Sequence, residues 1–253
     1  MILIKSPREI EAMRRAGAVV GQFFEEVRPL IRPGVSTWDL EAFADRFIAR
    51  NGVRTAFKGY MGYPAHLCTS INEEVVHGIP SKDRILRGGD ILSIDFGILR
   101  EGFYGDSAMT YPVGTVNGVS SRLLLVTEQS LAAGIREVRP GNHLGDVSAA
   151  VQEKAEAGGF SVVRDFVGHG IGRLLHEDPQ IPNFGKRGTG PKLTAGMVLA
   201  IEPMVNAGGW SVEVLSDGWT VVTRDRSRSA HFEHTVAVTE DGNRILSFSL
   251  DKP

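Results

Sequence analysis

The sequence predicts an α+β fold that arose by internal duplication, and two observations support this. Each half has the same order of predicted elements, namely helix, Arg-Pro-Gly, helix and strands. The Arg-Pro-Gly triplets at residues 32–34 and 139–141 are 107 positions apart, and so are the strand-like segments 89–95 and 196–202. Equal separations at both ends of a unit indicate a repeat. We therefore predict one domain over residues 1–253, with pseudo-repeats at about 1–115 and 116–253 that share one sheet, and expect functional residues where they meet.

In the first half, a long helix is predicted from a capping box at residues 6–9 with proline at the first helical position. Apolar residues then recur at helical spacing. After the first Arg-Pro-Gly, Ser36 or Thr37 can cap a second helix, which ends near residues 51–52. Residues 53–115 contain short Val- and Ile-rich runs punctuated by glycine and proline, which predict strands.

In the second half, the helical spacing returns and is again followed by strands. One predicted helix has its apolar face at Leu124, Leu131, Ile135 and Val138, and the next has its apolar face at Leu144, Val147 and Val151. The clearest strand-like runs after these helices are residues 197–202, 218–223 and 231–238.

The composition is that of an ordinary globular protein, with 42% hydrophobic and 23% charged residues. The net charge of -2 gives no whole-molecule attraction to nucleic acid or anionic lipid. The single cysteine, Cys68, excludes an intrachain disulfide and a thiolate metal cluster. No segment has the apolar length of a signal peptide or a membrane span, so we predict a cytoplasmic protein with no membrane partner and no nucleic-acid substrate.

Asp95 and Glu202 are the first candidates for chemistry because they end the two equivalent strand-like segments. A buried carboxylate is costly unless it is paired or bound to a metal ion. Either acid alone is as readily explained by a salt bridge or by a chance position at a strand end. Their equivalence in the repeat favours a shared site.

Asp106 and Glu233 add two further acids. Asp106 follows Asp95 across several glycines, so a hairpin can return it beside the first carboxylate, and Glu233 lies in an alternating, strand-like run. Each of them alone is more often a surface or turn residue. Four carboxylates on adjacent strands would repel one another too strongly to stay ionised without cations.

His169 completes the candidate metal site. The glycines on both sides let the backbone approach the site and leave the imidazole accessible, although a packed histidine in a glycine turn is reasonable for this residue alone. Four carboxylates and one imidazole suit a pair of divalent ions such as cobalt, manganese, iron(II) or zinc. Bridging carboxylates would place such ions roughly 3.5 to 4 Å apart, as in two-metal hydrolases.

The order of the motifs resembles a known family. HGIP, SIDFG, YGDSA, GHGIG, LLHEDP, AIEPM and HFEHT follow one another as in the type I methionine aminopeptidases, and the similarity extends from KSPREIEAMRRAG to the C-terminus. The resemblance implies the pita-bread fold, whose pseudo-two-fold symmetric halves surround an antiparallel sheet flanked by helices. It also implies a short bacterial form that hydrolytically removes the initiator methionine from nascent proteins and peptides with a small second residue.

The resemblance further implies a role for each candidate residue. His77 is expected near the scissile amide nitrogen and His176 near the carbonyl oxygen, although packing would be the better explanation of either histidine alone. Water activated between the metals would attack the peptide carbonyl, and Glu202 would shuttle the proton. The implied metal ligands are Asp95 for one ion, His169 and Glu202 for the other, and Asp106 and Glu233 as bridges.

The implied methionine pocket has apolar, polarisable walls, which suit a thioether. From the sequence alone, an aromatic cluster such as residues 59–63 is more often core packing. Met61, Leu175 and His231 depart from the family pattern, and we expect them to affect the pocket and the pH profile but not the metal site. The residues expected to contact substrate are Tyr60, Tyr63, Cys68 and Trp219, together with His77 and His176.

Two other functions remain open. A prolidase or proline-specific aminopeptidase of the same fold would use a similar metal set, but those enzymes carry an extra N-terminal domain, for which we expect no room here. A metal-free pita-bread binding module would have lost ligands, whereas all five stand at matching positions. We expect a monomer with two divalent metal ions per chain that acts on nascent polypeptide N-termini at the ribosome.

Overall fold

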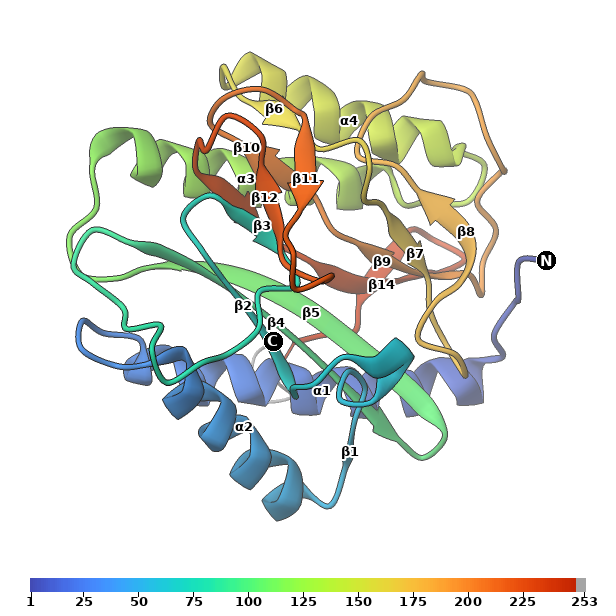
Figure 1. Ribbon diagram of the computed structural model, residues 1–253. Helices are drawn as coiled ribbons and strands as arrows, with labels where there is room; N and C mark the ends of the chain where they lie inside the picture. Colours follow the sequence, from blue (N-terminus) through green and yellow to red (C-terminus); the bar gives the residue numbers. More distant parts are fainter. Residues whose placement is uncertain (249–253) are drawn as a thin grey trace.

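The computed structural model describes residues 1–248, and its strands form a central layer between two pairs of helices (Figure 1). Residues 249–253 of the predicted domain lie outside the described residues. In Figure 1, α1 and α2 lie on one side of the strands, and α3 and α4 on the other. The helices are α1 (Pro7–Val27), α2 (Thr37–Asn51), α3 (Gly118–Glu137) and α4 (Leu144–Ala157), with 3-10 turns at Arg28–Leu30 and Tyr60–Gly62.

The strands pair in antiparallel fashion, and over residues 1–248 their hydrogen bonds divide them into four sheets instead of the one continuous sheet that the repeat predicts. Register shifts near His169 and Val221 interrupt the ladders. One sheet contains β1 (Arg54–Thr55), β4 (Ile91–Arg100), β2 (Leu67–Ile71) and β5 (Phe103–Pro112). Two three-stranded sheets contain β13 (Ser229–His231), β10 (Met204–Asn206) and β6 (Ser161–Val162), and β11 (Val212–Val214), β12 (Val221–Thr223) and β3 (Glu74–Val76). The fourth sheet contains β15 (Asn243–Ile245), β14 (His234–Val238), β9 (Val198–Ile201), β7 (Gly168–Gly170) and β8 (Glu177–Ile181).

The starts of the first two helices follow from local sequence. The capping box predicted at Ser6 is present at the start of α1, with Pro7 in the first turn. Ser36, and not Thr37, caps α2 through a second capping box. Gly52 ends α2 in the left-handed conformation, with φ of 61°.

The apolar faces predicted for the second pair of helices are largely buried. Leu131, Ile135 and Val138 belong to one core cluster with Leu144 and Val147 of α4, and Val151 belongs to another. The prediction was wrong at one position, because Leu123 is fully buried whereas Leu124 only packs against a cluster from its edge. The adjacent leucines differ by about 100° around the helix axis, so a small error in the face exchanges them.

Three strand predictions need correction. Asp95 does not end a strand but lies in the middle of β4, because β5 continues the pairing beyond it. The run at residues 218–223 becomes a strand only at Val221, after a turn in which Asp217 accepts hydrogen bonds from the backbone. The run at residues 231–238 is divided into β13 and β14.

The two Arg-Pro-Gly turns have matching geometry. Gly34 and Gly141 have φ of 89° and 94°, in the left-handed region that favours glycine. Their amides donate to the carbonyl oxygens of Leu86 and Leu193 at 2.9 and 3.1 Å. Both the glycines and their acceptors are 107 positions apart in the sequence. The single domain and its division near residue 115 stay predictions.

Helix α1 packs closely against the β4–β5 hairpin. Phe23 of α1 stacks on Phe96 of β4, with ring centroids 3.8 Å apart. A side chain at Gly105 of β5 would lie within 2.8 Å of the Gly17 nitrogen, so helix and strand backbones touch there. Within the described residues, none of the helices combines the length and hydrophobicity needed to cross a membrane.

Candidate metal centre and substrate pocket

The first half of the chain places two carboxylates on one face of the β4–β5 hairpin. Asp95 pairs with Ala108, and Asp106 pairs with Gly97, two residues further along β4. Residues two apart on a strand share a face, so the two acids are diagonal neighbours. Gly97 leaves room for the second acid, since a Cβ there would lie 3.0 Å from Oδ1 of Asp106.

The second half brings two more acids to the same place. Glu202 directly follows β9, and Glu233 lies between β13 and β14. The pairing of His234 with Ile201 places these two acids on adjacent chain segments. The amide of Glu233 donates to the carbonyl of Ala108 at 2.8 Å, which joins the second half to the β4–β5 hairpin.

His169 lies on β7 with its Nε2 atom facing the acids. Its Nδ1 atom lies 2.9 Å from the carbonyl oxygen of Gly170, and Nε2 lies 3.6 Å from Oε1 of Glu202. A proton on Nδ1 donated to that carbonyl leaves the lone pair of Nε2 free for a metal ion. Burial, with a smaller contribution from His176, lowers the pKa of His169 to about 3, so the imidazole is neutral.

The flanking glycines let β7 fit between its neighbours. A Cβ at Gly168 would lie 2.4 Å from the carbonyl oxygen of Ala200, and one at Gly170 would lie 2.1 Å from that of Asp178. Neither distance is compatible with a side chain. The glycines predicted to allow close backbone approach therefore do so on both sides of His169.

The four carboxyl groups cannot all be ionised together in the absence of cations. Burial raises the pKa of Asp95 to about 7 and that of Glu202 to about 8. Burial and the neighbouring acids raise the pKa values of Asp106 and Glu233 well above the usual range. Desolvation and like-charge repulsion thus act in the same direction.

The same residues fit bound cations. Ligand atoms of Asp106, His169 and Glu233 all lie within 4.8 Å of one another. Among the acids of this site, one buried oxygen each of Asp95, Asp106 and Glu233 has no hydrogen-bond partner. Buried acceptors without partners are unfavourable, and a divalent cation would satisfy them. A donor set of carboxylates and a neutral imidazole suits such an ion.

A cavity of about 170 Å³ opens beside these acids. Sequence reasoning overlooked one of its walls, Phe57, which carries no motif that distinguishes it from a core residue. The cavity brings together all the residues singled out for the site: His77, Asp95, Asp106, His169, His176, Glu202, Glu233, Tyr60, Tyr63, Cys68 and Trp219.

Two further histidines face the cavity. The Tyr60 hydroxyl lies 2.7 Å from Nδ1 of His176, and the rings of His169 and His176 have centroids 4.3 Å apart. The ring of His77 contacts that of Trp219 edge to face, with centroids 6.2 Å apart. Burial lowers the pKa of His77 to about 4 and also lowers that of His176, so both are neutral at pH 7.

The apolar wall of the cavity is formed by Tyr63, Cys68 and Trp219. The rings of Tyr63 and Trp219 pack edge to face, with centroids 5.0 Å apart. The Tyr63 hydroxyl lies 2.9 Å from the carbonyl oxygen of Leu67, so its polar atom is satisfied within the wall. Cys68 pairs with Asp95 across β2 and β4, which places the thiol beside the acids.

The three residues that depart from the family pattern have different surroundings. Met61 is 82% exposed at the edge of the cavity, whereas Leu175 is buried in its wall. His231 is buried, and its Nε2 atom lies 3.6 Å from Oε2 of Glu202. His231 is thus the departure that lies beside a predicted metal ligand, and the expectation that these departures leave the metal site unaffected stays a prediction.

Comparison with known proteins identifies the family. The model of metallopeptidase family M24 matches residues 11–240. Methionine aminopeptidase 1 of Bacillus subtilis is 53% identical over 98% of this chain and 99% of its own length. The methionine aminopeptidase of Escherichia coli is 44% identical over 99% of this chain and 95% of its own length.

Solved structures agree with the sequence comparison. A methionine aminopeptidase from Thermotoga maritima has a TM-score of 0.97 and 51% identity, over 98% of this chain and 100% of that one. A prolidase from Pyrococcus horikoshii has a TM-score of 0.79 at 20% identity, and this chain covers 64% of it, so it shares the fold.

The fold and the site thus define a metallopeptidase, and the chain belongs to metallopeptidase family M24. Within that family it belongs to the methionine aminopeptidases, which confirms the predicted pita-bread fold and the predicted class of enzyme.

Proposed function

We propose that this enzyme hydrolytically removes the N-terminal methionine from nascent proteins and peptides with a small second residue, using two divalent metal ions. The observation that carries the proposal is that the buried acids and His169 adjoin a cavity walled by Tyr63, Cys68 and Trp219. A site of this kind combines hydrolytic chemistry with a pocket for one apolar side chain.

The ligands assigned to the two ions follow the arrangement of the acids. Asp106 and Glu233 are the most deeply buried, and their unpartnered oxygens suit bridging positions. When bound, the cations supply Lewis acidity that polarises the scissile carbonyl and activates water. We assign Asp95 to one ion, His169 and Glu202 to the other, and Asp106 and Glu233 to both.

His176 is placed to stabilise the oxyanion that develops on the scissile carbonyl. With the Tyr60 hydroxyl donating to Nδ1, the neutral imidazole carries its proton on Nε2. This proton can then be donated to the oxyanion as its charge increases. A donor held in position before the reaction stabilises the transition state without further reorganisation.

Glu202 is the assigned proton carrier. Burial raises its pKa to about 8 before the ions bind, and it lies between His169 and His231, each of which is 3.6 Å from one of its oxygens. The carboxylate can take a proton from the attacking water and pass it to the leaving amine. His77, neutral on the other side of the cavity, is assigned a hydrogen bond near the scissile amide nitrogen.

The second residue of the substrate should be small because of His77. The imidazole packs edge to face against Phe166 and Trp219, with ring centroids 5.8 and 6.2 Å away, so these rings limit its movement away from a large side chain. Exclusion of this kind acts on the transition state and therefore lowers the specificity constant.

The test uses metal-stripped protein that is titrated anaerobically with iron(II), manganese, cobalt or zinc and then assayed with three peptides. We expect release of methionine from Met-Ala-Ser, little from Met-Lys-Ser, and no release of leucine from Leu-Ala-Ser. Equal cleavage of Met-Lys-Ser and Met-Ala-Ser would refute the initiator-methionine assignment. A preference for proline at the second position would favour the prolidase alternative, and absence of both metal binding and hydrolysis would favour a binding module.

The cellular setting completes the proposal. We place the enzyme in the cytoplasm as a monomer that meets polypeptide N-termini as they leave the ribosome. Size-exclusion chromatography with light scattering tests the monomer, and co-sedimentation with ribosomes tests the association. A stable dimer, or no sedimentation with ribosomes that carry Met-Ala nascent chains, would contradict the corresponding part.

A further inference from the structure

His77 depends on its surroundings for its position. It directly follows β3 and has φ of 60°, in the left-handed region that residues with a side chain rarely adopt. Such a conformation persists only where neighbouring groups determine it. The cavity wall therefore needs contacts that fix the backbone on both sides of His77.

The residue after His77 has one set of such contacts. The amide of Gly78 donates to Oγ of Ser70 at 3.2 Å, and its carbonyl oxygen accepts from the amide of Thr69 at 2.7 Å. A Cβ at Gly78 would lie 2.2 Å from the carbonyl oxygen of Thr69, so the chain is pressed against β2. These contacts set the path of the chain after His77 but not its position relative to β3.

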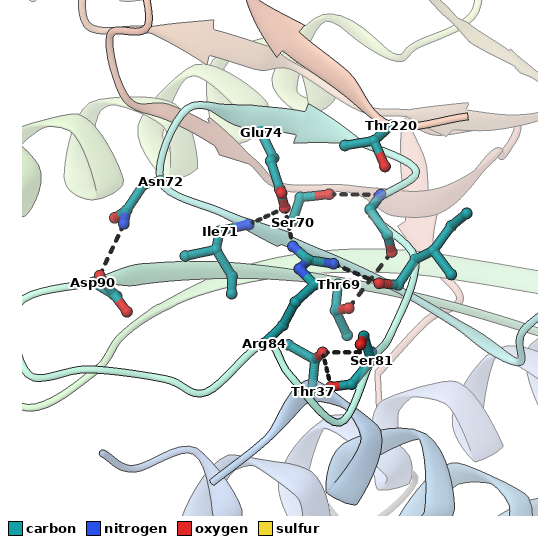
Figure 2. A network of polar contacts seen from close by, with 12 residues as sticks. Thr37, Thr69, Ser70, Ile71, Asn72, Glu74, Ser81, Arg84, Asp90 and Thr220 are labelled. Carbon is teal, nitrogen blue, oxygen red and sulfur yellow. Dashed lines mark hydrogen bonds and ion pairs between the residues drawn. The ribbon is translucent and has the colours of Figure 1, made fainter. Parts of the chain in front are cut away.

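A single guanidinium group connects the two sides of His77. Nη1 of Arg84 donates to the carbonyl oxygen of Ile79 at 2.6 Å, and Nη2 donates to Oε2 of Glu74 in β3. The same carboxylate oxygen accepts from the amide of Ile71 at 2.7 Å. Figure 2 shows Arg84 reaching from its loop to Glu74 beside Ile71. The chain from β3 to Ile79 is thus closed into a loop by one side chain.

The ion pair between Arg84 and Glu74 is largely shielded from solvent, so loss of either partner should have a clear effect. Side chains of Arg84 and Glu74 are 23% and 18% exposed, and burial raises the pKa of Glu74 even though Arg84 opposes that shift. Removing the guanidinium would leave a largely buried carboxylate without its counter-charge. Lysine could restore the charge, but its compact ammonium cannot reproduce the planar fork that reaches two acceptors.

The same cation also lies near the turn that carries Trp219 in the apolar wall of the cavity. β3 pairs with β12, and the turn before β12 contains Trp219. Asp217 holds that turn by accepting from the amides of Trp219 and Thr220, both at 2.8 Å. Burial opposes ionisation of Asp217, but these hydrogen bonds and the charge of Arg84 lower its pKa.

We propose that Arg84 is a positioning residue for His77: its guanidinium holds Glu74 before His77 to the Ile79 carbonyl after it, and thereby fixes the imidazole beside the scissile amide. This inference rests on the role proposed for His77 in methionine removal. Loss of the bridge lets His77 leave its left-handed conformation, while the acids and His169 keep their places on other strands.

The decisive experiment is a double-mutant cycle between Arg84→Met and His77→Ala, with kcat and KM measured separately on Met-Ala-Ser at saturating metal. Because misplacing a catalytic group by about 1 Å can reduce rates on the order of 100-fold, we expect Arg84→Met to lower kcat roughly 10- to 100-fold. KM should change less than about 3-fold, and the bound metal should be unchanged. In the His77→Ala background, Arg84→Met should have almost no further effect on kcat. Equal losses of kcat in both backgrounds would overturn the proposal.

Two other variants separate positioning from folding. Arg87→Met removes the same charge from an exposed position of the same loop and should leave kcat, KM and the melting temperature unchanged. Arg84→Lys should keep most of the melting temperature, because Glu74 retains a counter-charge, yet lose most of the kcat. Wild-type kcat in Arg84→Lys would show that the two-acceptor bridge is not required.

A spectroscopic measurement tests the position of His77 without depending on peptidase activity. In zinc-loaded protein labelled with 15N-histidine, the His77 imidazole signals are assigned by their loss in His77→Ala. We expect one sharp set in the wild type and in Arg87→Met, and broadened or doubled signals in folded Arg84→Met. Unchanged His77 signals in that variant would refute the positioning role. If the wild type released no methionine, the proposed function would be refuted, whereas the NMR signals of His77 would still decide whether Arg84 positions this residue.

Discussion

Replacing Asp106, one of the two carboxylates proposed to bridge the metal ions, by its amide should separate metal binding from folding. Asp106 is buried and its pKa is raised well above the usual range, chiefly by burial and then by Asp95, so its surroundings favour the protonated form in the metal-free protein. Asparagine resembles a protonated aspartic acid in shape and charge. Asp106→Asn should therefore change the free energy of unfolding of the metal-free protein by less than about 1 kcal/mol.

The metal-loaded protein should respond very differently. Metal at about 100 times its dissociation constant stabilises the native state by about 2.7 kcal/mol, which corresponds to a rise in melting temperature of roughly 5 to 10 °C for a chain of this size. If the amide weakens binding about 100-fold, the same metal concentration stabilises the variant by only about 0.4 kcal/mol. The rise in melting temperature should then fall to about 1 °C.

Differential scanning calorimetry with and without manganese measures both quantities, and peptide hydrolysis is followed on the same samples. The exposed Asp83→Asn is the matched control and should show the wild-type rise in melting temperature and wild-type turnover. A metal-induced rise in Asp106→Asn equal to that of the wild type, together with full turnover, would contradict the bridging assignment. A large destabilisation of the metal-free variant would contradict the raised pKa.

Three further outcomes can be measured. The folded-state pKa values of Asp95 and Glu202, about 7 and about 8, are above their unfolded values of about 4, so these two acids should make the metal-free protein lose stability as pH rises from about 4 to about 8; a melting temperature that rose over this range would contradict this. Lys5→Met should reduce the free energy of unfolding by about 3 to 5 kcal/mol in urea titrations, because it leaves buried Glu177 without the ammonium that lies 2.5 Å away; a loss under 1 kcal/mol would mean that water reaches this pair. Gly170→Ala should destabilise by about 1 to 3 kcal/mol and lower the metal affinity by calorimetry, since its Cβ would meet a carbonyl oxygen at 2.1 Å; unchanged affinity would show that β7 can shift without moving His169.

Local sequence was sufficient for features that depend on a few consecutive residues. The capping box at Ser6 defines the start of α1, and Gly52 ends α2, because these signals act on neighbouring backbone groups. The acids and His169 could also be singled out, since unusual residues in strand-like or glycine-rich segments are visible in the sequence. Their gathering at one cavity could be expected from the repeat, although the metal content of the site remains a prediction.

The three-dimensional structure alone decided which distant groups touch. Asp95 lies within a strand and not at its end because a partner strand extends the pairing, and partner choice is not written in the segment itself. His231 reaches Glu202, and Arg84 reaches Glu74 across the His77 loop, through contacts that depend on how separate elements pack. Spacing and propensity act over a few residues along the chain, whereas these contacts depend on distances in space that only the packed fold defines.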